Sequence, residues 1–165
     1  MSLALDWFRT REGEDPMVYL DDVFRYAMAR LGSREDAEDV AIEVVQALPN
    51  PCYRRDLRTY MFGVARRKAI DRQRRARPTV AVREEDASAR FDGASDHAAM
   101  VARAMSDLSE EHREALALKY IAGLTSAEIG RIVGKRPDAV DSLLQRARNA
   151  FAQAWTRLTS DEVNP

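Results

Sequence analysis

The sequence contains a single cysteine, Cys52, and no long run of apolar residues. One cysteine excludes a disulfide within the chain and fits a reducing compartment. No stretch approaches the ~20 apolar residues that a membrane-spanning helix needs. Residues 1–15 also lack a basic start followed by an apolar run, which is the pattern of a secretory signal. These absences predict a cytoplasmic protein with no membrane span.

The side chains that most often perform chemistry are scarce as well. There are two histidines, His97 and His112, and neither has a partner at metal-ligand spacing. No glycine-rich phosphate loop is followed by Lys and Ser or Thr. Nothing near Cys52 supplies the base that a nucleophile would need. The sequence therefore predicts no enzyme, no metal site and no cofactor.

The charges of the chain are strongly segregated, although the formal net charge is only −1. Residues 1–50 contain eleven acidic residues against five arginines, whereas residues 54–77 contain ten basic residues against two acidic ones. This division predicts one acidic and one basic surface, and so two different partners.

Apolar periodicity predicts helices over residues 18–31, 33–48 and about 56–76 in the first half of the chain. Gly32 ends the first of these, and Ser33 caps the second. The expected core positions of the third helix are Tyr60, Met61, Val64, Ala65 and Ile70.

The second half follows a linker. Residues 78–98 hold five acidic residues against two arginines and show no sustained period, which predicts a flexible acidic tether. Further helices are expected over 99–105 and from a cap at Ser109 to Gly123. The fold class is therefore all-α, with a helical domain over 1–77, the linker 78–98 and a second helical domain over 99–165.

Residues 123–151 predict a helix-turn-helix. Thr125 can cap a short helix, and Glu128 lies three positions on, as a capping box requires. Gly134 tolerates the positive φ of a helix end, and Pro137 suits the first turn of a second, longer helix. The second helix of such a motif enters the DNA major groove. The alternative is an ordinary helical hairpin in an all-α core.

A cluster of cations lies on the third helix. These residues predict phosphate contacts, which would make DNA binding strongly dependent on salt; the alternative is a solvated basic face. The candidate DNA contacts on this helix are Arg66, Arg67, Lys68, Arg72, Arg74 and Arg75.

The two halves together resemble the extracytoplasmic-function, or group IV, sigma factors of bacterial RNA polymerase. The second half resembles their −35-binding domain through LSEEHREALALKYIAGLTSAEIGRIVG and the later SLLQRAR. The first half resembles their core domain through Ala37-Glu38-Asp39 and RTYMFGVARRKAIDRQRR. The resemblance covers about residues 18–157, with both motifs in the family's order.

This resemblance implies a transcription initiation factor with five properties. It would bind the RNA polymerase core through Glu38, Asp39 and Glu43. Its basic helix would face the −10 element of promoter DNA. An anti-sigma factor would be a further partner, and the free protein would be a monomer. The helix-turn-helix would read the −35 element through Arg136, Ser142, Gln145, Arg146 and Arg148.

The sequence departs from the family pattern in several places. Ile42 stands where the family often has glutamine, and the interval between Glu43 and Tyr60, which holds the base-capturing loop in the family, is short. Asp138 and Asp141 lie near the start of the recognition helix, where an acid could accept a hydrogen bond from cytosine or stabilise the helix. These departures leave open a sigma-like decoy that binds an anti-sigma factor without promoter recognition. A stand-alone helix-turn-helix regulator is a third possibility, but it would leave the first-half match unexplained.

Overall fold

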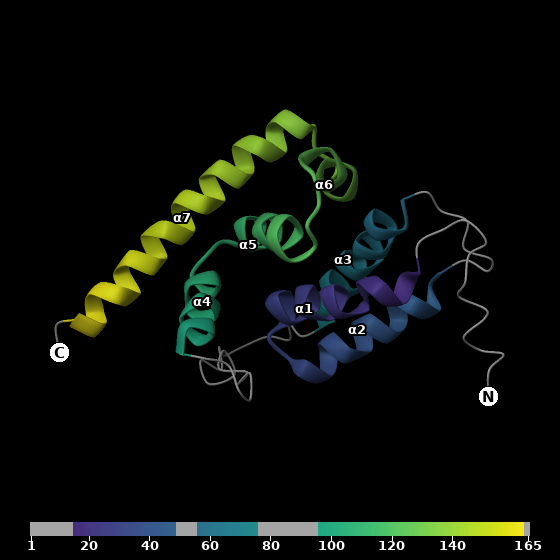
Figure 1. Cartoon of the computed structure of the whole chain (residues 1–165), viewed down its shortest axis with the longest axis horizontal. Helices are drawn as coiled ribbons and strands as arrows, with labels where there is room; N and C mark the ends of the chain where they lie inside the picture. The colour runs from purple at the N-terminus through teal and green to yellow at the C-terminus, as the bar shows by residue number, and fades with distance from the viewer. Residues whose placement is uncertain (1–14, 49–55, 76–95, 164–165) are drawn as a thin grey trace. The chain divides into compact units, whose positions relative to one another are not determined.

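The computed structural model describes residues 15–48, 56–75 and 96–163, and these residues form helices and turns with no strand. The chain divides into two compact units, Met1–Pro78 and Thr79–Pro165 (Figure 1). Cys52 and most of the predicted linker 78–98 lie outside the described residues. None of the helices described is both long and apolar enough to cross a membrane.

Unit 1 is a bundle of three helices preceded by one short turn of 3-10 helix. The turn is η2 (Pro16–Tyr19), and the helices are α1 (Leu20–Leu31), α2 (Arg34–Gln46) and α3 (Leu57–Arg75). Each of the three helices packs against the other two.

The local signals for the ends of α1 and α2 are confirmed. Gly32 has a φ of 69°, in the left-handed region where glycine is favoured, and its amide donates to the carbonyl of Met28. The hydroxyl of Ser33 accepts a hydrogen bond from the amide of Asp36 at 3.3 Å. The loop between α1 and α2 is therefore short and determined by two adjacent residues.

The core of unit 1 is built around two aromatic rings. Tyr26 on α1 meets Phe62 on α3 edge to face, with ring centroids 5.7 Å apart. Of the core positions predicted on α3, the buried ones are Met61, Val64 and Ala65.

The prediction was wrong for two core positions of α3. Tyr60 and Ile70 are only half-buried, and the hydroxyl of Tyr60 donates to the carbonyl of Ala47 at 3.2 Å. Leu57 and Phe62 fill the core instead, because helical spacing alone does not say which side of a nearly all-apolar turn faces inward.

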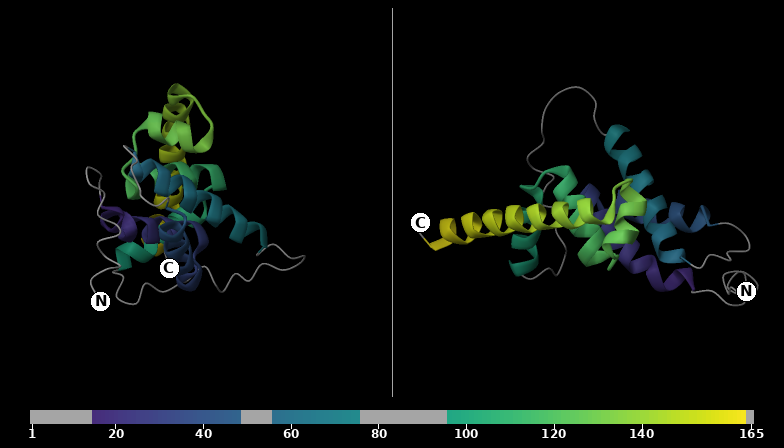
Figure 2. Two further views of the ribbon diagram at one scale, coloured as in Figure 1. Left: turned by 90° about the vertical axis from the view of Figure 1, so that its right-hand side faces the viewer. Right: turned by 90° about the horizontal axis from the view of Figure 1, so that it is seen from above.

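Unit 2 consists of α4 (Asp96–Ser106), α5 (Glu110–Leu116), the π turn η3 (Ala117–Ile121), α6 (Ser126–Val133) and α7 (Pro137–Val163). The helices α4, α5 and α6 each pack on α7, which is drawn in yellow-green along the unit (Figures 1 and 2). The helix α4 begins three residues before the predicted start at residue 99.

Arg113 holds the turn between α4 and α5. Its guanidinium donates hydrogen bonds to the carbonyls of Met105 at 3.0 Å, Ser106 at 2.9 Å and Leu108 at 3.1 Å. Carbonyls at the end of a helix have no partner within the helix, and a cation there also matches the helix dipole. Ser109 then caps α5, as predicted, by accepting from the amide of His112 at 3.3 Å.

Candidate nucleic-acid and protein interfaces

The first helix of the helix-turn-helix, α6, begins with the predicted capping box. The hydroxyl of Thr125 accepts from the amide of Glu128 at 3.3 Å, and the Glu128 carboxylate accepts from the amide of Thr125 at 2.7 Å. The helix ends at Gly134, whose φ is 72°, and α7 begins at Pro137. Both ends of α6 and the start of α7 thus lie at the residues that the sequence pattern singled out.

Gly130 controls how tightly the turn closes on α6. A Cβ atom at this position would lie 2.4 Å from the backbone carbonyl oxygen of Lys135, whereas van der Waals contact begins at 3.4 Å. The amide of Lys135 also donates to the carbonyl of Gly130 at 3.0 Å. Sequence reasoning missed this residue, although a glycine inside a helix is itself a signal of a close approach.

The helix α7 separates an apolar face from a polar one. Its inward side chains pack against α5 and α6, and they are Val140, Leu143, Leu144 and Ala147. All five candidate DNA contacts on this part of the chain are exposed, and they are Arg136, Ser142, Gln145, Arg146 and Arg148. The structure therefore leaves all five side chains open to solvent, with Arg136 just before α7 and the other four in its first half.

Several of these exposed side chains contact their own helix. Arg136 pairs with Asp138 at 3.2 Å, and the hydroxyl of Ser142 donates to the carbonyl of Asp138 at 3.1 Å. The Nε of Arg146 donates to the carbonyl of Ser142 at 3.4 Å. Exposed contacts of this kind are weak, so a phosphate or base edge can replace them.

Asp141 takes part in the packing of the motif. Its carboxylate accepts a hydrogen bond from the hydroxyl of Ser126, at the first turn of α6. This bond joins the two helices of the motif and gives the carboxylate a stabilising role. The acidic start of α7 is therefore accounted for in part by contacts within unit 2.

The six candidate DNA contacts on α3 fall into two groups. Arg67, Arg74 and Arg75 are exposed, whereas Arg66 is half-buried. Lys68 and Arg72 instead face α2, where they meet acidic side chains. The sequence prediction treated all six as one surface, and the structure divides them.

Arg72 is the centre of an ion-pair cluster between α2 and α3. Its Nη2 lies 2.8 Å from Glu43 Oε1 and 3.5 Å from Asp39 Oδ2, and its Nε lies 3.5 Å from Asp36 Oδ1. A second guanidinium hydrogen bond, from Nη1, reaches the other oxygen of Glu43 at 3.4 Å. Lys68 Nζ lies 3.1 Å from Glu43. We call these five residues the Arg72 cluster.

The cluster shifts the protonation equilibria of its two central groups. The hydrogen bond from Arg72 lowers the pKa of Glu43 from 4.5 to about 2, with a smaller contribution from Lys68, and partial burial opposes the shift. The hydrogen bond to Glu43 raises the pKa of Arg72 above its ordinary value, again against burial. Both groups are therefore charged throughout the neutral range.

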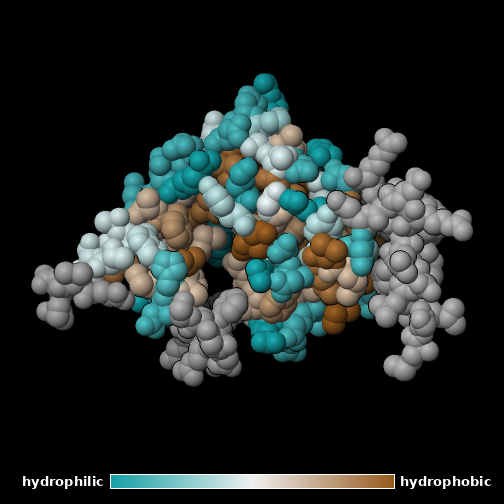
Figure 3. Space-filling model, viewed as in Figure 1, coloured by the Kyte–Doolittle hydropathy of each residue, from teal (hydrophilic) through white to brown (hydrophobic). Residues whose placement is uncertain are grey.

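The outward face of α2 carries the remaining acidic candidates. Glu38 is exposed and pairs with Arg34 at 2.8 Å, one turn earlier on the same helix. Asp39 is also exposed, and Ile42 beside it is a large apolar side chain that is 56% exposed. On the face that Figure 3 shows, brown hydrophobic residues lie in patches bordered by teal hydrophilic ones.

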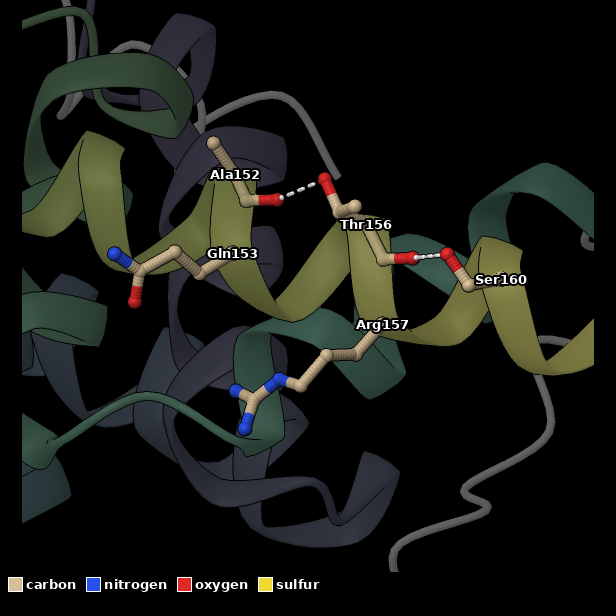
Figure 4. Close-up of a pocket in the computed structure, with 5 residues that line it drawn as sticks. All are labelled: Ala152, Gln153, Thr156, Arg157 and Ser160. Atoms are coloured by element: carbon tan, nitrogen blue, oxygen red, sulfur yellow. Dashed lines mark hydrogen bonds between the residues drawn. The ribbon is translucent and has the colours of Figure 1, made fainter.

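Within the described segments, no three His, Cys, Asp or Glu side chains are grouped so as to hold a metal ion. A hollow beside α7 is lined by residues that include Thr156, Arg157 and Ser160 (Figure 4). The hydroxyls of Thr156 and Ser160 donate to backbone carbonyls one turn back, at 2.9 and 2.8 Å, so neither is held by a base.

Comparison with known families matches both units. Residues 17–79 match the family description of sigma-70 region 2, and residues 98–151 match that of sigma-70 region 4. The loop in which the family captures a flipped base would fall in residues 49–55, outside the described segments.

Curated relatives are similar over most of the chain. The ECF RNA polymerase sigma factor SigL of Mycobacterium tuberculosis is 31% identical over 154 residues, which is 86% of this chain and 84% of the relative. The ECF RNA polymerase sigma factor SigM of Bacillus subtilis is 26% identical over 155 residues, or 88% of this chain and 95% of the relative.

A solved structure shares the fold. It is that of the sigma factor RpoE in complex with the anti-sigma factor NepR from Bartonella quintana. The TM-score is 0.65 at 18% identity, and the match covers 85% of this chain and 93% of the solved chain.

Proposed function

The chain belongs to the extracytoplasmic-function sigma factors of the sigma-70 family, and from that premise we propose that it binds the RNA polymerase core and directs it to promoter DNA. The observation that carries the proposal is the presence of both family regions, in the family's order, on two helical units. The polymerase performs the chemistry of transcription, so this chain is an initiation factor and not an enzyme. Its place of action is proposed to be the cytoplasm, where bacterial polymerase meets its template.

We assign polymerase binding to the outward face of α2. Asp39 and Ile42 lie one turn apart and are both exposed, with Glu38 beside them. An exposed apolar side chain between carboxylates suits a basic partner surface with an apolar centre, because burial of Ile42 would then add to the charge pairing. Glu43 lies at the edge of this surface, and Arg72 and Lys68 hold its carboxylate in place.

We assign promoter binding to two separate surfaces. On α3 the exposed cations Arg67, Arg74 and Arg75, with Arg66 beside them, face the −10 region. The exposed polar side chains of α7, together with Arg136 just before it, lie in the major groove of the −35 element, in the manner of a recognition helix. Phosphate contacts by the arginines would position the protein, and Gln145 and Arg146 are suited to base edges.

The anti-sigma factor remains part of the proposal. The solved relative of similar fold is bound to such a factor, and an exposed acidic α2 is a surface that an inhibitor could cover in competition with polymerase. The decoy interpretation depended partly on the acidic start of α7. That argument is weaker now that Asp141 has a partner within the motif.

Binding to bacterial core RNA polymerase tests the proposal directly. The experiment compares the wild-type chain with Asp39→Arg, and with the matched control Asp21→Arg, which changes an exposed acid on α1. Glu43→Arg is a poorer choice than Asp39→Arg, because Glu43 lies 2.8 Å from Arg72 and 3.1 Å from Lys68, whereas Asp39, among the described residues, meets Arg72 alone, at 3.5 Å. Reversing the charge of Glu43 would therefore disturb the packing of α2 on α3 more. We expect the wild type and the control to bind and Asp39→Arg to fail.

Transcription then separates the sigma factor from the decoy. Core polymerase with the wild-type chain is supplied with fragmented bacterial genomic DNA, and the new transcripts are sequenced. Discrete start sites that require the chain would support promoter recognition. Core binding without any start site would indicate the decoy, and no core binding by the wild type would overturn the proposal.

A further inference from the structure

Arg72 differs from the other cations of α3 in its surroundings. Only 17% of its side chain is exposed, and its guanidinium reaches the carboxylates of Asp36, Asp39 and Glu43. These three acids are spaced three and four residues apart, so they lie along one side of α2. A phosphate that approached this guanidinium would have to compete with these carboxylates, above all with Glu43, which accepts two of its hydrogen bonds.

The shape of the arginine side chain explains why one residue serves three acids. A guanidinium is planar and has five donors in a rigid fork, whereas an ammonium group is a compact charge with three. The fork gives Glu43 two hydrogen bonds, at 2.8 and 3.4 Å, and still lies within 3.5 Å of Asp36 and Asp39. Without that charge, the carboxylates along α2 would repel one another.

The same contacts reach the outward face of α2. Asp39 Oδ2 lies 3.5 Å from Arg72, yet 56% of the Asp39 side chain is exposed. One side of this carboxylate is therefore held while the rest can meet a partner. We propose that Arg72 is a positioning residue, which presents Asp39 and Glu43 to the RNA polymerase core and makes no direct contact with DNA. This inference rests on the proposed function, because it names what shapes the polymerase-binding surface.

The test measures the affinity of full-length variants for bacterial core RNA polymerase. We expect Arg72→Gln to weaken core binding by roughly three- to thirtyfold, the range typical of residues that act on a site without contacting its ligand. Arg72→Lys should weaken it as well, because lysine keeps the charge and loses the fork. Arg25→Gln is the matched control, since it removes an exposed arginine that pairs with Asp21 on α1, and it should leave core binding unchanged.

Two further variants distinguish positioning from simple destabilisation. Val40→Ala opens a cavity under α2 without changing a charge, since Val40 is fully buried. It should lower the unfolding temperature and leave core affinity intact while the protein is folded. In a double-mutant cycle, Asp39→Asn and Arg72→Gln should be non-additive in core binding, because one acts through the other.

The outcomes decide between the possibilities. Loss of core affinity in Arg72→Gln with a non-additive cycle supports the inference. Core affinity equal to that of the wild type, with promoter binding weakened as in Arg75→Gln, would make Arg72 a DNA contact and overturn it. If Val40→Ala and Arg72→Gln lost core affinity equally, the inference would also be overturned, because Arg72 would then have a structural role alone. Failure of the wild type to bind core would instead count against the proposed function.

Discussion

Gly130→Ala is the most direct test of the helix-turn-helix geometry. The new Cβ would lie 2.4 Å from the carbonyl oxygen of Lys135, about 1 Å closer than van der Waals contact allows. The obstacle is backbone, so it cannot rotate away as a flexible side chain would. Either α6 moves away from the turn, or the hydrogen bond from the Lys135 amide to the Gly130 carbonyl lengthens.

The magnitude follows from two opposing terms. Overpacking of a well-packed site costs about 1–3 kcal/mol, and replacing glycine by alanine inside a helix returns about 1 kcal/mol. Because the obstacle is backbone and the Cβ would lie only 2.4 Å from it, the upper part of the overpacking range applies, about 2–3 kcal/mol. We therefore expect a net loss of about 1–2 kcal/mol in the free energy of unfolding of unit 2. For a unit of this size each kcal/mol lowers the melting temperature by about 4–8 °C.

Gly63→Ala is the matched control. Gly63 lies inside α3, and a Cβ added there would have no neighbouring atom within 4 Å, so alanine at this position should stabilise unit 1 by about 1 kcal/mol. Thermal unfolding followed by circular dichroism measures both variants. A Gly130→Ala protein as stable as the wild type, with the expected gain in Gly63→Ala, would refute the reasoning about the close approach.

Four further predictions concern single side chains. The free energy of unfolding of the full chain should fall as pH drops from about 4.5 to about 2, because a carboxyl whose folded pKa is lowered to about 2 binds protons more readily when unfolded. Denaturant titrations across this range measure the change, and Glu43→Gln should make the unfolding free energy depend less on pH. The same pH dependence in Glu43→Gln as in the wild type would contradict this prediction. Thr125→Ala should cost about 1 kcal/mol through loss of the capping box, whereas Thr156→Ala, in an exposed mid-helix position, should cost much less in the same thermal assay. Arg113→Ala should cost about 2 kcal/mol, because it removes hydrogen bonds from a charged group to three carbonyls, and a melting temperature like that of the wild type would disprove it. Arg75→Gln should reduce the slope of log affinity against log salt for promoter DNA by about 1, and a constant slope would remove Arg75 from the interface.

The parts of the fold that depend on adjacent residues were predictable from the sequence. Ser33 and Thr125 cap helices because a short oxygen side chain reaches an amide two or three residues on. Gly134 ends α6 because the left-handed region penalises other residues. Each of these signals acts over a few positions, so a pattern of residues contains the whole cause.

The division of the cations on α3 could not be predicted in the same way. Whether Arg72 faces solvent or α2 depends on how two helices separated by a loop are rotated about their axes. The acids and the arginines were both visible in the sequence, and their segregation suggested two external partners. The Arg72 cluster shows that part of this opposite charge is matched within unit 1.

The π turn η3 has a consequence for the length of the segment before the helix-turn-helix. The amide of Ala122 donates to the carbonyl of Ala117 at 3.1 Å, five residues back, so this turn holds one residue more than an α-helical turn. In an α-helix each residue rotates the chain about the helix axis by about 100°. Removing one residue here would let α5 continue as a regular helix. The chain would then run from the end of that helix toward α6 in a different direction. Substitution of the exposed Tyr120 keeps that direction, so among natural relatives this position should vary in residue type far more freely than the segment varies in length.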